Sequence, residues 1–528
     1  MLRPQVTLDP CDIYLAAGNQ DDEILHSCQR YWIAEAIRYT HREAVEGLFM
    51  DRNLTTTGQM RKQVVLTDWP ELPSIERLPS RKTPHYGLGP ILENEGTISS
   101  IYNIIDTIFT EQLGYNRTED FGERLQLVYG DQKTVSLVRT VQKEQQEATL
   151  LYDKYNWLLA VPGLFHWRTN YMDMIHDTYS GSEHAAVEST LYHNKNYLGC
   201  IQGHKSPFHH KEEVATRAFD ARVTALFYRL LPPSVHTTRP NEVDNYIRKL
   251  SHTTFHRKVE EIRQYIFTAT EQSPDASKPI DYEFSAHAKF LQQMETYKTL
   301  KYAIKHADVG LIKRALVRCC LLFHGSDKSK YAFLSLYMTW LTQTDAASKE
   351  LQDAILANGL VNLRNTNDSW FEMDRLNEFF NLQMKVLMAT RRTSTIDTAE
   401  LFRRTALTAS YCTDLKVAIE AAFGEYSNGR HQIKDASQDV RYLAYQIAAS
   451  RSITKHTHGR SSPFQPTDIL QRGIKLLNGG VKRFNHTVIE GQWDEEEDLS
   501  NVTTTPITAL DDIVTMDDDA YDWDNSNK

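Results

Sequence analysis

Apolar residues return at helical spacing along most of this chain. Residues 23–49 and 95–114 carry them every three or four positions, which is typical of amphipathic helices. From about residue 183 to residue 480 nearly every segment has the same period, with no repeat of fixed length. Five prolines between residues 66 and 92 interrupt the pattern and predict an irregular connector. We therefore expect a mainly α-helical protein.

One short segment has a different pattern. The run Arg124-Leu-Gln-Leu-Val-Tyr129 alternates and is rich in β-forming residues, which predicts a strand centred on Gln126–Gly130. A helix is expected from Thr134, a second strand at Trp157–Val161, and another helix near Phe165. This strand–helix–strand–helix succession is the only α/β signature in the sequence and predicts a small α/β segment.

The net charge of −10 is spread unevenly along the chain. Residues 491–528 hold twelve Asp or Glu and one Lys, a net of −11, so residues 1–490 are close to neutral at about +1. This acidic tail (residues 491–528) has low hydrophobicity and no periodicity, which predicts disorder. Residues 431–490 have a net charge of +5. A basic segment beside an acidic tail indicates either self-shielding against a polyanion or an ordinary solvated helix before a frayed end.

The sequence gives three indications of compartment. No apolar run approaches the roughly 18 residues of a membrane helix, so no membrane partner is expected. Residues 1–11 contain no apolar core of a secretory signal. Six cysteines occur without a Cys-x-x-Cys pair, which favours free thiols in a reducing compartment. We expect an intracellular protein of the nucleus or cytoplasm.

Two residues that can carry chemistry follow the predicted strands. Asp131 lies directly after the first strand, where α/β proteins bind ligands, and Mg²⁺ prefers one or two carboxylates. A Gly-Asp pair is also a common turn. His166 follows the second strand and is a candidate ligand or base, although a lone His on an aromatic face is more often structural.

Residues 365–381 predict the most informative helix. Ser369 and Glu372 fit the spacing of a capping box, so the helix is expected to begin near Trp370. Asp374 and Glu378 lie one turn apart on one stripe, where two acids repel by a few tenths of a kcal/mol. The stripe is suited to a divalent cation or to a solvated helix face.

Several short motifs occur in the order of a known family. They are Tyr129-Gly-Asp-Gln-Lys-Thr134, Val161-Pro-Gly-Leu-Phe-His166 with Asn170, Ser206-Pro-Phe-His209, Gly325-Ser-Asp-Lys-Ser-Lys-Tyr-Ala332 and Asp374-Arg-Leu-Asn-Glu-Phe-Phe-Asn381. Over roughly residues 60–425 they resemble an uncharacterised domain family, abundant in fungi, with a strand-end Gly-Asp-Gln motif (domain of unknown function six-five-eight-nine). Its arrangement is similar to that of transposon-derived proteins with a ribonuclease-H-like core.

The resemblance implies a degenerate ribonuclease-H-like core interrupted by a large helical insertion. Asp131 would be the second catalytic acid, His166 the motif histidine and Glu378 the last acid. Asp131 and Glu378 would hold Mg²⁺ in an active version and so are expected to lie close together. The resemblance divides the chain into five segments: an N-terminal helical segment (1–60), an α/β core part (61–182), a helical insertion (183–360), a helical C-terminal core part (361–490) and the disordered acidic tail (491–528).

One departure from the family pattern bears on activity. The family has an upstream Tyr-Asp-Asn-like segment before a Thr-Thr pair, whereas residues 31–51, upstream of Thr55-Thr-Thr57, contain none and have a helical pattern. Two-metal chemistry needs carboxylates that hold both ions about 4 Å apart. Unless Glu95, Asp106 or Asp374 takes the vacant place, we expect no DNA cleavage.

Two functions follow from these observations. The first is a transposon-derived protein that has lost cleavage and retains nucleic-acid contact, with DNA as its candidate partner and no certain cofactor. The alternative is a helical protein-interaction scaffold with an acidic tail and no catalytic role. The near-neutral body favours the scaffold, because nucleic-acid binders usually show a stronger basic excess, whereas the ordered motifs favour transposon descent.

Overall fold

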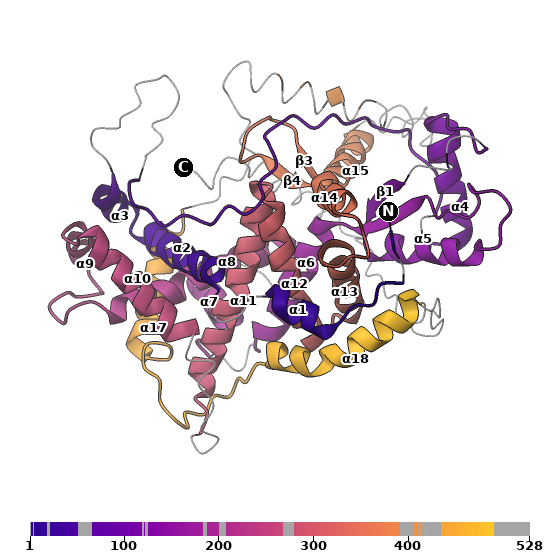
Figure 1. The fold of residues 1–528 in the computed structure, drawn as a ribbon. Coiled ribbons are helices and arrows are strands. Elements are labelled where there is room, and N and C mark those ends of the chain that lie inside the picture. The colour runs from indigo at the N-terminus through magenta and orange to yellow at the C-terminus, as the bar shows by residue number, and fades with distance from the viewer. Residues whose placement is uncertain are drawn as a thin grey trace.

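The computed structural model describes most of the chain. It covers residues 2–3, 5–17, 22–50, 66–94, 96–118, 121, 125–182, 187–199, 207–267, 279–390 and 435–489, with single positions between 406 and 418. The acidic tail and its predicted disorder lie outside the described residues. Helices dominate the described part, which confirms the mainly helical fold class (Figure 1). None of the described helices is long and apolar enough to cross a membrane.

The predicted α/β segment is present. Strands β1 (Gln126–Gly130) and β2 (Leu158–Pro162) pair in parallel, with Gln126 opposite Leu158 and Gly130 opposite Pro162. Helix α5 (Gln132–Glu144) connects them, and α6 (Leu164–Tyr179) follows β2. Strand β2 is buried along its whole length, and the buried valines on one side of α5 pack against the pair. The sheet and α5 lie at one end of the molecule (Figure 1).

The N-terminal region is helical, as predicted. Its helices are α1 (Pro10–Ala17), α2 (Glu23–Thr40) and α3 (Arg42–Phe49), so the described part of residues 31–51 is mainly helical. Further on, α4 (Ile98–Asp106) continues into one π-helical turn, η1 (Thr107–Gln112), and the chain turns at Gly114 with a φ of +71°. Residues 66–92 form the expected irregular connector without helix.

A long helical region follows the α/β unit. Helices α8 and α11 are buried on nearly every side, which explains why their sequences show a weak amphipathic pattern. Cys28, Cys319 and Cys320 are buried free thiols, whereas Cys11 and Cys412 are exposed. The helices of this region are α7 (Leu191–Tyr197), α8 (Phe208–Arg229), α9 (Pro240–Arg248), α10 (His252–Phe267), α11 (Tyr282–Lys305), α12 (Val309–Gly325), α13 (Ser329–Gln343) and α14 (Lys349–Asn358).

The predicted capping box before α15 is wrong. Strands β3 (Leu360–Asn362) and β4 (Trp370–Glu372) pair antiparallel, and α15 (Met373–Thr390) begins only after them. The side chain of Glu372 turns into the protein interior, where it is fully buried against Arg168. Because this carboxylate accepts a hydrogen bond from Arg168, it does not turn back to cap the start of the helix.

The last described helices belong to the same core. Helix α17 (Ser437–Ser450) packs on α8, and α18 (Ile469–Ile489) crosses α12. The α12–α18 crossing is close because it uses glycines: a Cβ on Gly325 would meet the carbonyl oxygen of Ile469, and one on Gly473 would meet that of Leu321. One connected cluster of buried side chains extends from Leu8 to Phe484. The five segment boundaries stay a prediction.

Candidate functional site

Two of the predicted site residues lie at the carboxyl ends of the parallel strands. Asp131 follows β1 and caps helix α5, because its carboxylate accepts the backbone N–H of Thr134 at 2.7 Å. His166 lies in the first turn of α6, just after β2. The two strand ends are tied together by the N–H of Gly163, which donates to the carbonyl of Gly130 at 2.8 Å.

Helix α15 brings two more acids to this place. The Asp374 carboxylate accepts the backbone N–H groups of Phe165 and His166, both at 3.1 Å, and so caps α6 from another element. The His166 ring lies between the two acids of the stripe, with Nδ1 3.1 Å from Asp374 Oδ2 and Nε2 3.9 Å from Glu378 Oε1. We refer to Asp131, His166, Asp374 and Glu378 as the His166 cluster.

Gly163 makes the approach of Asp374 possible. Its φ of −71° is open to any residue, so backbone conformation does not require glycine there. A Cβ at this position, however, would collide with the carboxylate of Asp374. The Pro-Gly that ends the second strand in the sequence motif therefore has a spatial role, because it leaves room for an acid from α15.

The cluster favours a charged imidazole. Burial alone would lower the pKa of His166, but the hydrogen bond to Asp374 and the charges of Asp374, Glu378 and Asp131 raise it above its ordinary value. All three carboxylates therefore favour the charged form of the imidazole, and Asp374 has the largest effect. The acids of the α15 stripe thus face the His166 ring and favour its charged form.

The residues present do not fit a two-metal centre. Both oxygens of Asp374 already accept backbone N–H groups of α6, and one oxygen of Asp131 accepts the N–H of Thr134. Within the described residues, no group of three or more His, Cys, Asp or Glu is arranged to hold a metal ion. The geometry therefore gives these acids partners of their own and provides no cradle for a pair of Mg²⁺ ions.

Three residues were candidates to replace the missing upstream acid, and one of them lies in the cluster. Asp374 is part of it. Asp106 lies elsewhere, because its carboxylate pairs with Arg117 and accepts a hydrogen bond from Tyr152. Glu95 lies outside the described residues.

A buried ionic network lies beside the cluster and was missed from the sequence. Arg168, two residues after His166, donates to Glu372 at 2.5 Å and to Glu212 at 3.1 Å. Tyr297 from α11 donates to Glu212 at 2.5 Å, and Lys301 lies 2.9 Å from the same carboxylate. We refer to these five residues as the Arg168 network. The signals in the sequence are an arginine two positions after the motif histidine and a glutamate two positions before Asp374.

The network is buried except for Lys301, whose side chain is 51 % exposed. Arg168 is 3 % exposed and Glu372 is fully buried. Burial alone would raise the pKa of Glu212, but the charges of Lys301 and Arg168 lower it to about 2. Since Arg168 bridges α6, β4 and α8, it fixes the segment that carries Asp374 and Glu378 against the helix that carries His166.

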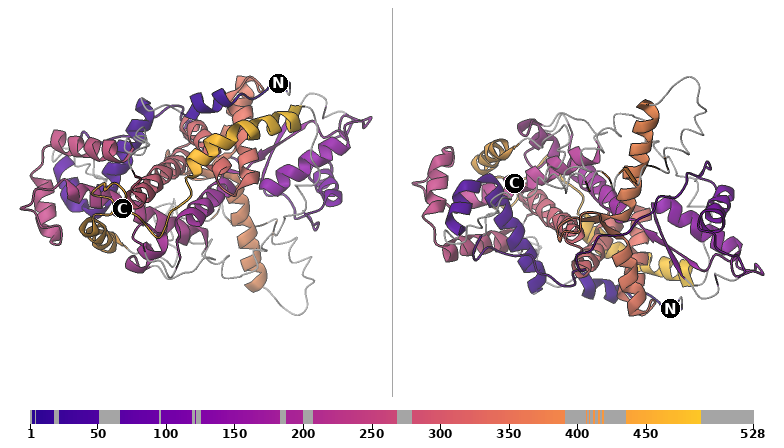
Figure 2. Two further views of the ribbon diagram at one scale, coloured as in Figure 1. Left: turned by 90° about the horizontal axis from the view of Figure 1, so that it is seen from below. Right: turned by 90° about the horizontal axis from the view of Figure 1, so that it is seen from above.

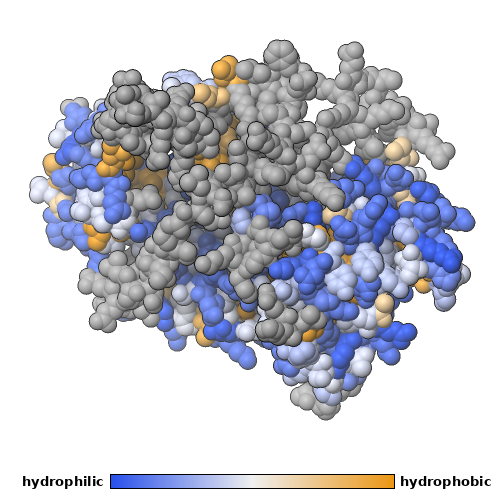
Figure 3. All heavy atoms as spheres, turned by 180° about the vertical axis from the view of Figure 1, so that it is seen from behind, coloured by the Kyte–Doolittle hydropathy of each residue, from blue (hydrophilic) through white to orange (hydrophobic). Residues whose placement is uncertain are grey.

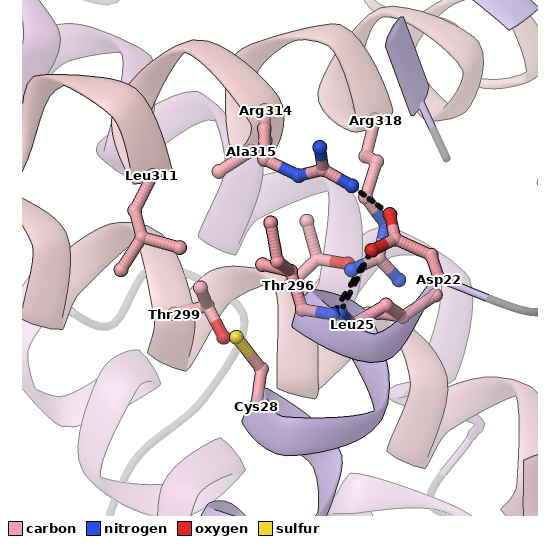
Figure 4. A pocket seen from close by; sticks show the side chains of 10 residues that line it. Asp22, Leu25, Cys28, Thr296, Thr299, Leu311, Arg314, Ala315 and Arg318 are labelled. Atoms are coloured by element: carbon pink, nitrogen blue, oxygen red, sulfur yellow. Dashed lines mark hydrogen bonds and ion pairs between the residues drawn. The ribbon is translucent and has the colours of Figure 1, made fainter. Parts of the chain in front are cut away.

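A small cavity lies far from the strand ends, between α2, α11 and α12 (Figure 4). Its volume of about 20 Å³ has room for roughly one water molecule. Asp22 caps α2 there through the backbone N–H of Leu25 and pairs with Arg314. Burial raises the pKa of the Cys28 thiol to about 12, so it is not a reactive nucleophile. We find a structural role for this place and no ligand site.

A second candidate surface is the outer face of α18. Its inner face, with Gly473, Leu477, Val481 and Phe484, is buried against α12 and α13. Its outer face carries exposed cations and no Asp or Glu occurs anywhere in the helix. Seen from below, α18 lies on the outside of the described structure (Figure 2). These cations, which we call the basic face of α18, are Arg472, Lys475, Lys482 and Arg483.

The fold and the His166 cluster define a mainly helical protein with a small parallel α/β unit whose strand ends gather acidic residues. The chain belongs to a family of unknown function, DUF6589, whose model matches residues 41–431. The match includes the α/β unit and every member of the His166 cluster and the Arg168 network, whereas α18 and the acidic tail lie beyond it. Among curated proteins and solved structures, none matches this chain.

Proposed function

We propose that this protein descends from a transposon-encoded enzyme with a ribonuclease-H-like core, no longer cuts DNA, and acts by binding nucleic acid. The order of elements supports the descent. Asp131 directly follows β1, His166 lies in α6 and Glu378 lies in α15, and a long helical region separates His166 from Glu378. The distance of 3.9 Å between His166 Nε2 and Glu378 Oε1 supports the proposal that these residues descend from one site.

The loss of cleavage rests on the partners of Asp374. In a working two-metal site the carboxylates hold the ions that activate the attacking oxygen and stabilise the leaving one. Here both oxygens of Asp374 bind the amide groups of α6, and the His166 imidazole lies between Asp374 and Glu378. An acid that serves as a helix cap and a histidine counter-ion has a structural role.

The binding role rests on the basic face of α18. Four exposed cations on one helix with no acid form an electrostatic surface for phosphates. The scaffold alternative is less well supported. Protein-binding surfaces often show a large exposed apolar patch, whereas hydrophilic side chains dominate the coloured part of the face seen from behind in Figure 3. Nucleic-acid binding also makes the nucleus the proposed site of action.

Binding of a short fluorescent DNA duplex to the full chain, followed by anisotropy at about 50 mM salt, tests this proposal because electrostatic binding is strong there. The variant K475E/K482E should weaken binding at least about tenfold and flatten the salt dependence, since each lost phosphate contact lowers the slope by about one. The matched control is K249E/R257E, which reverses two exposed cations near α9 and α10. An unchanged affinity in K475E/K482E, or equal losses in both variants, would contradict the proposal.

A further inference from the structure

The segment that follows α18 has the opposite charge to the helix itself. Helix α18 has four cations and no acid. Five acids, Asp494 to Asp498, begin five positions beyond its last residue, and seven more follow between 511 and 524. The helix dipole adds partial negative charge at the C-terminal end of α18, so this end repels the acids while the side of the helix attracts them.

We infer that the basic face of α18 is the docking surface of the acidic tail of the same chain. This inference rests on the proposed function, because a tail bound there competes with nucleic acid for the same four cations. The tail acts as an internal polyanion that sets how strongly the protein binds DNA, and strong phosphate binding requires its release.

The distances allow this contact. Lys482 lies seven residues before the end of α18, or about 11 Å along the helix axis. The five residues 490–494 span up to about 17 Å when extended, so the first acidic run reaches Lys482 and Arg483. Arg472 and Lys475 are about 21 to 26 Å from the helix end, and the later acids reach them with chain to spare.

Charge selects this surface over the rest of the protein. Residues 431–490 have a net charge of +5 and residues 1–490 about +1, so residues 1–430 have a net charge of about −4. The tail is therefore attracted by the region that contains α18 and repelled on average by the remainder. Tethering favours the tail of the same chain over that of a second copy, because only four residues separate α18 from the first acid of the tail and a short tether gives an effective concentration in the mM range.

Carbodiimide crosslinking of the full chain, mapped by mass spectrometry, tests the contact directly because it joins a lysine to a carboxylate that touches it. Lys475 and Lys482 should crosslink to tail carboxylates far more than the exposed Lys249 does. An equal mixture of light and heavy-isotope protein should give crosslinks within one isotope. Crosslinks that are absent, spread equally over lysines, or randomly mixed between isotopes would overturn the inference.

DNA affinity tests the competition. The variant E495Q/E496Q/E497Q removes three tail charges and should bind DNA about tenfold more tightly than the wild type at the same low salt. The matched control E43Q/E147Q/E261Q removes three charges from exposed glutamates of the body and should bind within about twofold of the wild type. Equal effects of the two triple variants, or none, would overturn the competition.

The two readouts separate this inference from the proposed function. If crosslinks form as expected but neither the wild type nor E495Q/E496Q/E497Q binds DNA, the proposed function fails and the docking stands. If both proteins bind DNA through Lys475 and Lys482 with the same affinity and no crosslinks form, the proposed function stands and the docking fails.

Discussion

Two ionic groups join helix α6 to the segment that leads into α15, and they differ in exposure. Arg168 and Glu372 form the inner one, which is buried and built from charges that persist at every pH near neutrality. His166 and Asp374 form the outer one, in which the histidine side chain is 29 % exposed and its pKa is raised, against the effect of burial, by the hydrogen bond to Asp374 and by nearby carboxylates. The inner pair holds the two elements together, and this places His166 beside Asp374 in the outer pair.

The difference shows which protein groups hold the acids at the strand ends in place. In an enzyme that needs a metal, repulsion between the carboxylates is relieved when the ion binds. Here the backbone N–H groups of α6 and the His166 ring relieve it, and Arg168 holds the elements in register. The His166 cluster is complete with protein groups alone.

The largest effect is expected from breaking the inner pair. The substitution Arg168→Met keeps an apolar side chain in place but leaves the fully buried Glu372 without the arginine that donates to it, whereas Lys301 still pairs with Glu212. The free energy of unfolding should fall by about 3 to 5 kcal/mol, the usual cost of removing one partner of a buried pair. Chemical denaturation measures it.

A matched control for this substitution is Arg117→Met, because Arg117 pairs with Asp106 at the surface and its side chain is 49 % exposed. The control should cost about 1 kcal/mol or less. Equal losses in the two variants would show that the inner pair has no special structural role.

The next effect concerns the space between α6 and α15. In Gly163→Ala the new methyl group collides with Asp374, and we expect a loss of about 1 to 3 kcal/mol, as for other overpacked sites. Gly479→Ala, where a Cβ meets nothing within 4 Å on helix α18, should instead stabilise the protein by about 0.5 to 1 kcal/mol. Thermal unfolding of both variants gives the sign, and a neutral Gly163→Ala would mean that Asp374 does not lie against α6.

The smallest effect is a pH dependence that the outer pair has and the inner pair lacks. Because the pKa of His166 is raised in the folded protein, its stabilising contribution is present below the unfolded value of about 6.5 and is lost as pH rises through the folded value. The stability difference between wild type and His166→Gln should therefore shrink between neutral and alkaline pH, by about 1 kcal/mol or less.

A histidine on the same helix provides the control. Burial lowers the pKa of His176 to about 4, so this residue is neutral throughout that range and His176→Gln should keep a constant difference from wild type. A wild-type minus His166→Gln difference that stays constant from neutral to alkaline pH would show that the ring is not charged in the cluster.

Local pattern predicted the elements that carry the cluster, and it failed where distant residues decide. Strands β1 and β2 and the helices after them were predicted because alternation and helical period are local signals. The capping box at Ser369 and Glu372 was a local signal that a distant partner overrode: Arg168, 204 positions away, takes the glutamate. Strand β4 forms where the sequence predicted the first turn of a helix.

The site was predicted in part. His166 Nε2 lies 3.9 Å from Glu378 Oε1, and the expected closeness of Asp131 and Glu378 stays a prediction. The counter-ion role of His166 and the caps formed by Asp131 and Asp374 were not predicted, because each depends on which N–H group or ring faces a carboxylate. The spacing of residues in the sequence does not reveal which way each side chain points. The helical pattern predicted for residues 31–51 is confirmed for their described part, where α2 and α3 lie.

The most direct test of the central claim is a cleavage assay on the full chain with Mg²⁺ or Mn²⁺, using supercoiled plasmid and an end-labelled duplex. Because the carboxylates of the His166 cluster are held by protein groups, the account predicts no nicking and no strand joining with either metal. Metal-dependent cleavage that disappears in Asp131→Ala and Glu378→Ala would contradict this prediction. It would show that the carboxylates of the cluster give up their protein partners and bind metal ions.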